Sequence, residues 1–310
     1  MQGKIDIFGM TDQGRVRQRN EDQFLVADLT KSLRLHQSSL SVDDNETLFG
    51  GSQGQLLIVA DGLGGHSSGD RASQVAVQAI TTYMLNTMPW FFRLDPSQDE
   101  DFREELVEAL KQCETSMAVE ETVHPNEKGM GTTLTMGYVI WPRMYLLHVG
   151  DSRCYRFRDG RLAQLTHDHT VKQQLLDAGI NDEIEDDVAE RWSNTLWNSI
   201  GAGCVASPDV SRVDLQLGDT LLFCTDGLTR HVDDDVLQNR LQSDLDAEHQ
   251  CRSLIHEAIN NGGSDNVTVI VARFLNRETA LEAAAQTKAV PVSPDLKLSG
   301  DSTIDAPVSP

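Results

Sequence analysis

The chain has 310 residues, 39% of them hydrophobic, which is enough apolar material for a globular protein with a substantial core. Its 48 acidic and 26 basic residues give a formal net charge of −22, which disfavours binding to nucleic acid or to an anionic membrane surface. There is no signal-peptide pattern at the start of the sequence, and no apolar run long enough to span a membrane. Five scattered cysteines without a Cys-x-x-Cys pair suggest free thiols in a reducing compartment, so we expect a cytoplasmic protein.

In chain order, short runs rich in Val, Ile, Leu, Tyr and Phe predict strands at residues 3–10, 23–28, 55–61, 132–140, 144–151, 154–160, 219–226 and 266–274. The sequence RFRDGRLAQL predicts a hairpin with Asp159 and Gly160 at its turn. The polar, Gly/Ser-rich segment 36–54 is expected to be a loop before the third strand.

Three segments place apolar residues on one face of a helix, at 72–84, 102–117 and 251–259. Each has a single apolar stripe, so each helix should pack one side against a sheet. Because strands come in runs with helices grouped between them, the predicted fold class is α+β. Residues 169–210 mix helical and irregular sequence, whereas 276–310 lack a periodic apolar face, which is typical of a disordered tail.

Five of the predicted strands have an aspartate at one end. Asp61, Asp151 and Asp226 each end an apolar run. Asp22 and Asp265 each precede one. A single Asp-Gly after a strand is ordinarily a turn. If the strands share one core, however, their ends can converge on one rim.

Converging carboxylates need protons or cations, because two like charges 4 Å apart repel by roughly 4 kcal/mol at an effective dielectric constant near 20. A set of oxygen ligands without clustered cysteine or histidine favours Mg²⁺ or Mn²⁺ over Zn²⁺. A glycine after such an aspartate, as at Gly62, lets its carbonyl approach an ion. The residues therefore predict a carboxylate-rich metal site, and no P-loop or G-x-G-x-x-G motif competes with it.

Six motifs occur in order: RVRQRNEDQF, VADGLGGHSSGDRAS, GMGTTLTM, HVGDSRCYRFRDGRLAQLTHDHT, LLFCTDGLTRHV and SDNVTVIVARF. Together they resemble the metal-dependent protein phosphatases of the protein phosphatase 2C type, particularly the compact bacterial members. The resemblance covers roughly residues 3–274 and implies a β-sandwich of two antiparallel sheets, with helices on both outer faces and a metal site at one end. It also implies a catalytic domain at 1–275 with a flap at about 170–205, whose Trp192 and Trp197 are expected to pack or to contact a partner.

The ligand set follows from the resemblance, motif by motif. Asp61 would bridge two Mn²⁺ or Mg²⁺ ions, and the carbonyl of Gly62 would bind one of them. Asp226 and Asp265 would ligate the other ion, with Asp22 close by in the same site.

Two further residues complete the implied site. Asp151 matches the position that, together with Asp226, holds a third ion in bacterial relatives. Arg17 matches the arginine that grips the substrate phosphate, for which a guanidinium fork is well suited. The simpler interpretation of Arg17 is a solvated charge, since Arg15 and Arg19 flank it.

The general acid stays unassigned. Many eukaryotic relatives carry a histidine two residues after the bridging aspartate, whereas this chain has Leu63 there. His66 is one candidate substitute, but a packed or solvent-facing histidine is an equally good interpretation. Glu21 is expected beside the site and not as a direct ligand.

Several polar residues that resemble ligands are expected to be structural. The HDHT segment at 167–170 matches a turn of the family, and His148 lies within a predicted strand. Thr132 and Thr133 are expected to begin a buried strand.

The resemblance implies a monomeric enzyme that hydrolyses phosphoserine and phosphothreonine in proteins. A metal-activated water would attack phosphorus without a covalent enzyme intermediate. Its partners would be phosphorylated proteins, among them a bacterial Ser/Thr kinase and its substrates. The alternatives are a non-catalytic scaffold that has lost its metals, which the intact aspartates disfavour, and hydrolysis of nucleic-acid phosphodiesters, which the charge of −22 disfavours.

Overall fold

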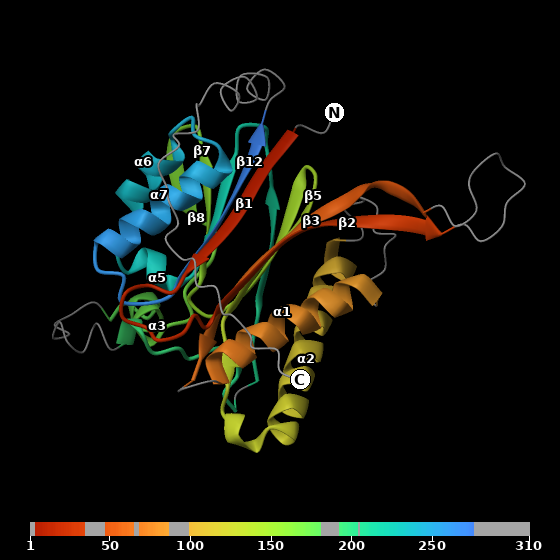
Figure 1. Ribbon diagram of the computed structural model, residues 1–310, viewed down its shortest axis with the longest axis vertical. Helices are drawn as coiled ribbons and strands as arrows, with labels where there is room; N and C mark the ends of the chain where they lie inside the picture. Colours follow the sequence, from red (N-terminus) through yellow and green to blue (C-terminus); the bar gives the residue numbers. More distant parts are fainter. Residues whose placement is uncertain are drawn as a thin grey trace, which may run out of the picture.

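The computed structural model describes residues 4–34, 47–64, 68–86, 99–180, 192–203 and 205–275. Within these residues, two antiparallel sheets pack face to face and helices cover both outer surfaces (Figure 1). The predicted α+β sandwich with four layers is therefore confirmed. Residues 276–310 lie outside the described residues, so the disordered tail and the domain boundary at 275 stay predictions.

The first sheet has five strands in the order β1-β12-β11-β7-β8. Their bounds are β1 (Lys4–Asp12), β12 (Val267–Leu275), β11 (Thr220–Cys224), β7 (Arg153–Arg158) and β8 (Arg161–Gln164). β7 and β8 form the predicted hairpin. At its turn, Asp159 and Gly160 have φ angles of 50° and 75°, the left-handed conformation that a two-residue hairpin loop requires.

The second sheet has seven strands, in the order β10-β6-β5-β3-β4-β9 with β2 paired to β3. Their bounds are β2 (Asp22–Arg34), β3 (Thr47–Leu63), β4 (Gly131–Thr132), β5 (Leu134–Ile140), β6 (Arg143–Val149), β9 (Ile200–Gly201) and β10 (Asp209–Asp214). The loop expected over 36–54 is wrong from Thr47 onward, because β3 already pairs with β2 there. Pairing with a neighbouring strand outweighs the weak strand propensity of this polar segment. Residues 36–46 lie outside the described residues.

The helices form two outer layers (Figure 1). Their bounds are α1 (Ser68–Asn86), α2 (Asp99–Val123), α3 (Val171–Asp177), α5 (Asp226–Thr229), α6 (Asp234–Leu241) and α7 (Ala247–Asn260). The three predicted helices are α1, α2 and α7. α1 and α2 cover the seven-stranded sheet, and α5, α6 and α7 cover the other.

Alternate side chains along the strands face different cores. In β3, Leu56, Ile58 and Ala60 pack with α1 and α2. Leu57 and Val59 pack between the two sheets. A strand covered on both faces is apolar throughout, which is why the run from 56 to 60 does not alternate with polar residues.

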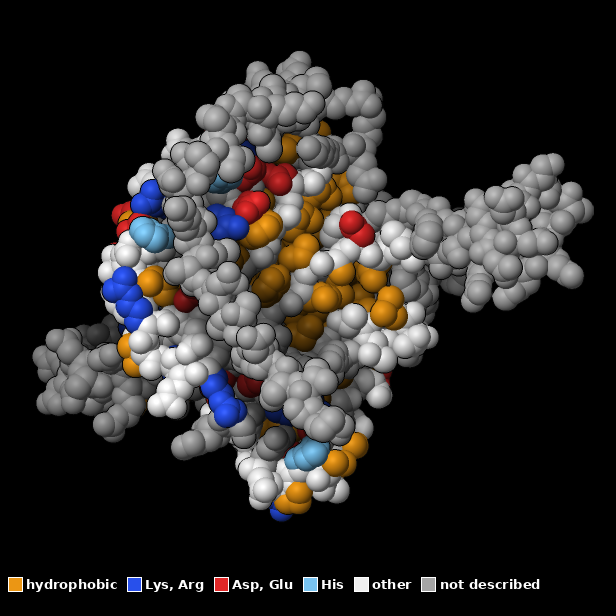
Figure 2. All heavy atoms as spheres, viewed as in Figure 1, with side chains coloured by type: hydrophobic (Ala, Val, Ile, Leu, Met, Phe, Trp, Pro, Cys, Tyr) orange, Lys and Arg blue, Asp and Glu red, His pale blue; other side chains and the backbone are white. Residues whose placement is uncertain are grey.

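The margins of the inter-sheet core are only partly covered. Phe24 and Val26 of β2 and Ile5 and Ile7 of β1 are partly buried against it. Figure 2 shows apolar side chains gathered over this part of the face. None of the described helices is long and apolar enough to cross a membrane.

The cysteines behave as predicted where they are described. The thiols of Cys113, Cys154, Cys224 and Cys251 are buried and free. Cys204 lies outside the described residues.

Candidate metal centre

The register of β2 and β3 brings two of the predicted ligands together. Asp22 and Asp61 are directly opposed partners in the antiparallel pair. Side chains at such positions are neighbours, and like charges there destabilise the pairing. The fold thus places two carboxylates where they repel unless a proton or cation lies between them.

Two of the remaining carboxylates come from the other sheet, and the third, Asp151, follows a strand of the sheet that carries Asp22 and Asp61. Asp226 follows β11 as the first residue of α5, and Asp265 lies just before β12. Asp151 follows the end of β6. Each of these three side chains belongs to a residue that is at most 9% exposed. Their charges act on one another and on Asp61, so the structure brings the predicted aspartates into one cluster.

Two glycines that follow clustered aspartates are required by close backbone approach. A Cβ on Gly62 would lie 2.2 Å from the carbonyl oxygen of Gly69. A Cβ on Gly227 would lie 1.9 Å from the carbonyl oxygen of Asn266. Any side chain at either position would push the neighbouring aspartate away from the rim. The ion-binding role expected for the Gly62 carbonyl stays a prediction.

Burial and mutual repulsion disfavour the charged forms of these carboxylates. Burial, followed by the charges of Asp226 and Asp265, raises the pKa of Asp22 to about 7. The pKa of Asp61 is raised well above its ordinary value, first by burial and then by the charge of Asp22. Burial likewise raises the pKa values of Asp151 and Asp226. Perturbed carboxylates gathered in one place are typical of functional sites.

Two carboxylate oxygens in the cluster lack a hydrogen-bond partner. These are Oδ1 of Asp22 and Oδ1 of Asp226, both buried. Buried polar atoms are nearly always paired, so an unpaired oxygen beside like charges calls for a cation. Oxygen donors of this kind suit Mg²⁺ or Mn²⁺, so the residues present fit the expected ions.

Two arginines contact the outer side of the cluster. The guanidinium of Arg17 grips Asp265 with both arms, with Nε 2.7 Å from Oδ1 and Nη2 2.8 Å from Oδ2. Arg230 donates to Oδ2 of Asp226. Among the residues that the structure describes, no group of three or more Asp, Glu, His or Cys side chains is arranged so that it could hold a metal ion as it stands. The ion pairs that the two arginines form with Asp265 and Asp226 balance part of the charge of the cluster.

Threonine hydroxyls hold the aspartates in place, a role that sequence reasoning did not identify. Thr225 and Thr268 donate to Oδ2 of Asp22 over 2.8 and 2.7 Å. The backbone N–H of Asp61 donates to Oγ1 of Thr133, 2.9 Å away. Both aspartates are thus held by hydroxyls from other segments: Thr268 lies on β12, Thr225 just after β11 and Thr133 between β4 and β5. Only the position of Thr225 directly before Asp226 could have suggested this from the sequence.

The segment at 167–170 has the structural role predicted for it. Asp168 holds Arg153 through a two-armed ion pair, and Thr170 caps α3. His169 accepts a hydrogen bond from the backbone N–H of Gly150, the residue before Asp151. This histidine therefore also positions the turn that carries a predicted ligand.

The other structural predictions are confirmed where the residues are described. His148 is 1% exposed in β6, and Thr132 and Thr133 are fully buried at the start of the β4–β5 region. In the flap, the Trp197 ring packs 4.8 Å from that of His169 and is 44% exposed. His66, the candidate general acid, lies outside the described residues.

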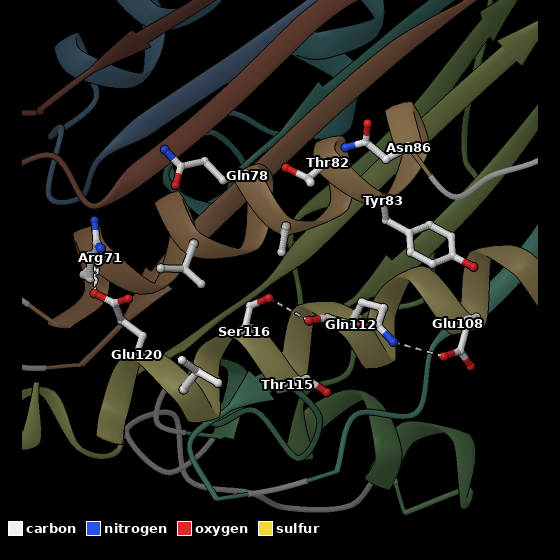
Figure 3. Close-up of a pocket in the computed structure, with 13 residues that line it drawn as sticks. Arg71, Gln78, Thr82, Tyr83, Asn86, Glu108, Gln112, Thr115, Ser116 and Glu120 are labelled. Carbon is white, nitrogen blue, oxygen red and sulfur yellow. Dashed lines mark hydrogen bonds and ion pairs between the residues drawn. The ribbon is translucent and has the colours of Figure 1, made fainter. Parts of the chain in front are cut away.

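The larger of two cavities is not the one at the carboxylate cluster. A cavity of 790 Å³ lies between α1 and α2 (Figure 3). Its charged side chains are already paired, as Arg71 with Glu120 at one end. A smaller cavity of 340 Å³ at the rim is lined by Asp151, Asp226 and Arg230. Asp226, one of the two aspartates with an unpaired oxygen, lies at the smaller cavity, and we place the candidate site at this rim.

The chain belongs to the protein phosphatase 2C family of serine/threonine protein phosphatases, because residues 34–276 match the family described as Protein phosphatase 2C. It is 33% identical over 246 residues to the serine/threonine protein phosphatase PstP of Mycobacterium tuberculosis, a match that covers 79% of this chain and 45% of PstP. The chain thus spans about half the length of PstP. It is also 33% identical over 264 residues to the serine/threonine phosphatase stp of Listeria welshimeri, covering 84% of this chain and 92% of that protein.

A solved structure of a relative holds the expected metal. The catalytic domain of a serine/threonine protein phosphatase PstP, in complex with two manganese ions, matches this fold with a TM-score of 0.67. The two share 29% identity, and the match covers 88% of this chain and 99% of that one.

Proposed function

We propose that this protein removes phosphate from phosphoserine and phosphothreonine in other proteins, using two or three Mn²⁺ or Mg²⁺ ions. The observation that carries the proposal is the buried cluster in which Asp22 and Asp226 each have an unpaired carboxylate oxygen. Family membership and the manganese in a relative's structure support it. Asp61 and Asp265, with the Gly62 carbonyl and Asp151, would complete the ligand set.

When bound, the divalent cations would supply an activated water and would stabilise negative charge on the phosphoryl oxygens. The chain's own contribution is to hold the ligands still. Hydroxyls of Thr225 and Thr268 fix one oxygen of Asp22, Oδ2, and the other, Oδ1, is buried without a hydrogen-bond partner and would be available to an ion. Close packing at Gly62 keeps Asp61 on the same rim.

Arg17 would bind the substrate phosphate. Its side chain is 49% exposed, although it forks onto Asp265. A guanidinium at the edge of the cluster can turn its second face to phosphate oxygens, which it binds with paired N–H groups. In a protein with a net charge of −22, such a local cation also attracts an anionic phosphopeptide to the site.

The biological partners belong to the same proposal. We infer that the protein acts in the cytoplasm as a monomer and reverses phosphorylation by a bacterial Ser/Thr kinase on that kinase's substrates. The names of its relatives, serine/threonine protein phosphatases of bacteria, support this assignment. The flap at 170–205, of which 181–191 and 204 lie outside the described residues, would tune access to the site.

A phosphatase assay with and without metal tests the proposal. A phosphothreonine peptide and p-nitrophenyl phosphate should be hydrolysed in Mn²⁺ or Mg²⁺ and not in excess EDTA, with activity restored when Mn²⁺ is added back. Turnover that persists unchanged in EDTA would contradict the metal-dependent mechanism. A protein that binds Mn²⁺ but hydrolyses neither substrate would instead indicate the non-catalytic scaffold.

A further inference from the structure

Arg230 lies against the outer side of the carboxylate cluster. It follows Asp226 by four residues, and α5 (Asp226–Thr229) turns its side chain back onto that carboxylate. Nε of Arg230 lies 2.8 Å from Oδ2 of Asp226, and Nη2 donates to the same oxygen. Nη1 lies 3.8 Å from Oδ2 of Asp265. One guanidinium thus spans two of the predicted metal ligands.

The same cation also acts on Asp151. Burial alone would lower the pKa of Arg230, but the charges of Asp226, Asp265 and Asp151 raise it above its ordinary value. Arg230, Asp151 and Asp226 line the same rim cavity of 340 Å³. The guanidinium is therefore the cation next to the two carboxylates that the family resemblance assigns to a third ion.

The two oxygens of Asp226 have different surroundings. Oδ2 accepts two N–H groups of Arg230, whereas Oδ1 is buried and unpaired. Oδ1 is thus free for an ion of the inner cluster with Asp22 and Asp61. An outer ion would have to displace the guanidinium from Oδ2 and would be repelled by its charge.

We propose that Arg230 takes the place of a third divalent cation between Asp151 and Asp226, so that this protein binds two metal ions and not three. The inference rests on the proposed function and deepens it, because it concerns the occupancy of the same site. A guanidinium held covalently on α5 supplies its positive charge at any metal concentration, whereas a weakly held outer ion would come and go with the metal supply.

Counting bound Mn²⁺ tests this inference without reference to turnover. The metal-stripped full chain is titrated with MnCl₂ by calorimetry, and the bound ions are counted by native mass spectrometry. The wild type should bind two Mn²⁺. Arg230→Asn should bind a third, because Asp226 Oδ2 and Asp151 then face the cavity without a cation. Arg230→Lys should stay at two, because the positive charge remains.

A matched control removes a similar ion pair far from the cluster. Arg252 contacts Glu248 four residues earlier on α7, the same spacing as Arg230 and Asp226. Arg252→Asn should therefore leave the count at two. If Arg230→Asn fails to fold, a count of three on the wild type or on Arg230→Lys still overturns the inference.

The outcomes separate this inference from the proposed function. Three Mn²⁺ on the wild type, or the same count of two on wild type and on folded Arg230→Asn, would overturn the role of Arg230 and leave the phosphatase proposal intact. A wild type that binds no Mn²⁺ would overturn the metal centre and this inference with it.

Discussion

The two ends of strand β11 each carry a buried aspartate, and the two have opposite surroundings. Asp219, just before the strand, has a fully buried side chain gripped by Arg158 at 2.5 and 2.6 Å and by the backbone N–H of Gln216 at 2.8 Å. Asp226, just after the strand, has one oxygen without a partner and lies among other carboxylates. A buried carboxylate whose two oxygens both have hydrogen-bond partners stabilises the fold. A buried carboxylate that has an unpaired oxygen and lies among other carboxylates indicates a site that binds cations.

The largest effect on turnover is expected when Asp226 is replaced by asparagine, and the same replacement of Asp219 is its comparison. Asp226→Asn should lower phosphatase turnover by more than about 100-fold, because loss of a partner behind a metal ligand already costs about 10- to 100-fold. Its melting temperature in EDTA should hold, since the lost charge also removes repulsion within the cluster.

Asp219→Asn is the reciprocal variant. It should retain kcat but unfold about 2 kcal/mol more easily, because Arg158 loses its buried partner. Thermal melts and p-nitrophenyl phosphate assays on both variants provide the measurement. Wild-type turnover in Asp226→Asn, or lost turnover in folded Asp219→Asn, would contradict the assignment of a functional role to Asp226 and a structural role to Asp219.

A smaller effect, on Mn²⁺ affinity, is expected when a threonine hydroxyl that holds Asp22 is removed. Thr268→Val keeps the shape and strand preference of the side chain but removes a hydrogen bond to Asp22. We expect Mn²⁺ affinity to fall about 10- to 100-fold, and Thr268→Ser to restore it. Thr220→Val, at the far end of β11, is the control. Equal affinities in Thr268→Val and the wild type, by calorimetry, would show that Asp22 needs no such support.

The smallest effect concerns pH and the buried His148. Burial lowers the pKa of His148 to about 3, against 6.5 ordinarily. Between these values the unfolded chain binds the proton and the folded chain does not, so His148 contributes a loss of stability as pH drops below 6.5, by up to about 1.4 kcal/mol per pH unit. Burial lowers the pKa of His169 too, which adds in the same direction. In metal-free protein the raised pKa values of Asp22 and Asp61 contribute in the opposite direction, so the effect of His148 is the difference between the wild type and a His148 variant.

Urea unfolding at pH 7, 6 and 5 measures this slope. His148→Gln should remove the His148 contribution, so that the variant loses less stability on acidification than the wild type, while the same change at the exposed His249 should not alter the slope. A slope in His148→Gln equal to that of the wild type would assign the pH dependence to other groups.

Much of this organisation was predictable, because strand periodicity and strand-end aspartates are local signals. The sequence pattern identified the strands that carry Asp61, Asp151 and Asp226 and their meeting at one rim. It missed β10, in which no residue is buried, and α6, in which only Leu237 and Leu241 are buried. Weak apolar patterns of this kind do not stand out from loops.

The supporting residues were harder to predict. Thr268 resembles an ordinary β-branched strand residue, and its hydroxyl gains a role only when β12 lies beside Asp22. Arg230 resembles a solvated charge until α5 turns it toward Asp226. Such roles depend on contacts between residues far apart in the chain, which no local pattern records.

The aspartates of the cluster come from both sheets: Asp22 and Asp61 are partners on one, while Asp226 and Asp265 flank strands of the other. Ions coordinated by both pairs of aspartates would link the two sheets of the sandwich to each other. The metal concentration would then determine how firmly the two sheets are held together, as well as the proposed phosphatase activity. Amide hydrogens of β2 and β11 near the rim should exchange more slowly together when Mn²⁺ is added, as the two layers cease to open independently.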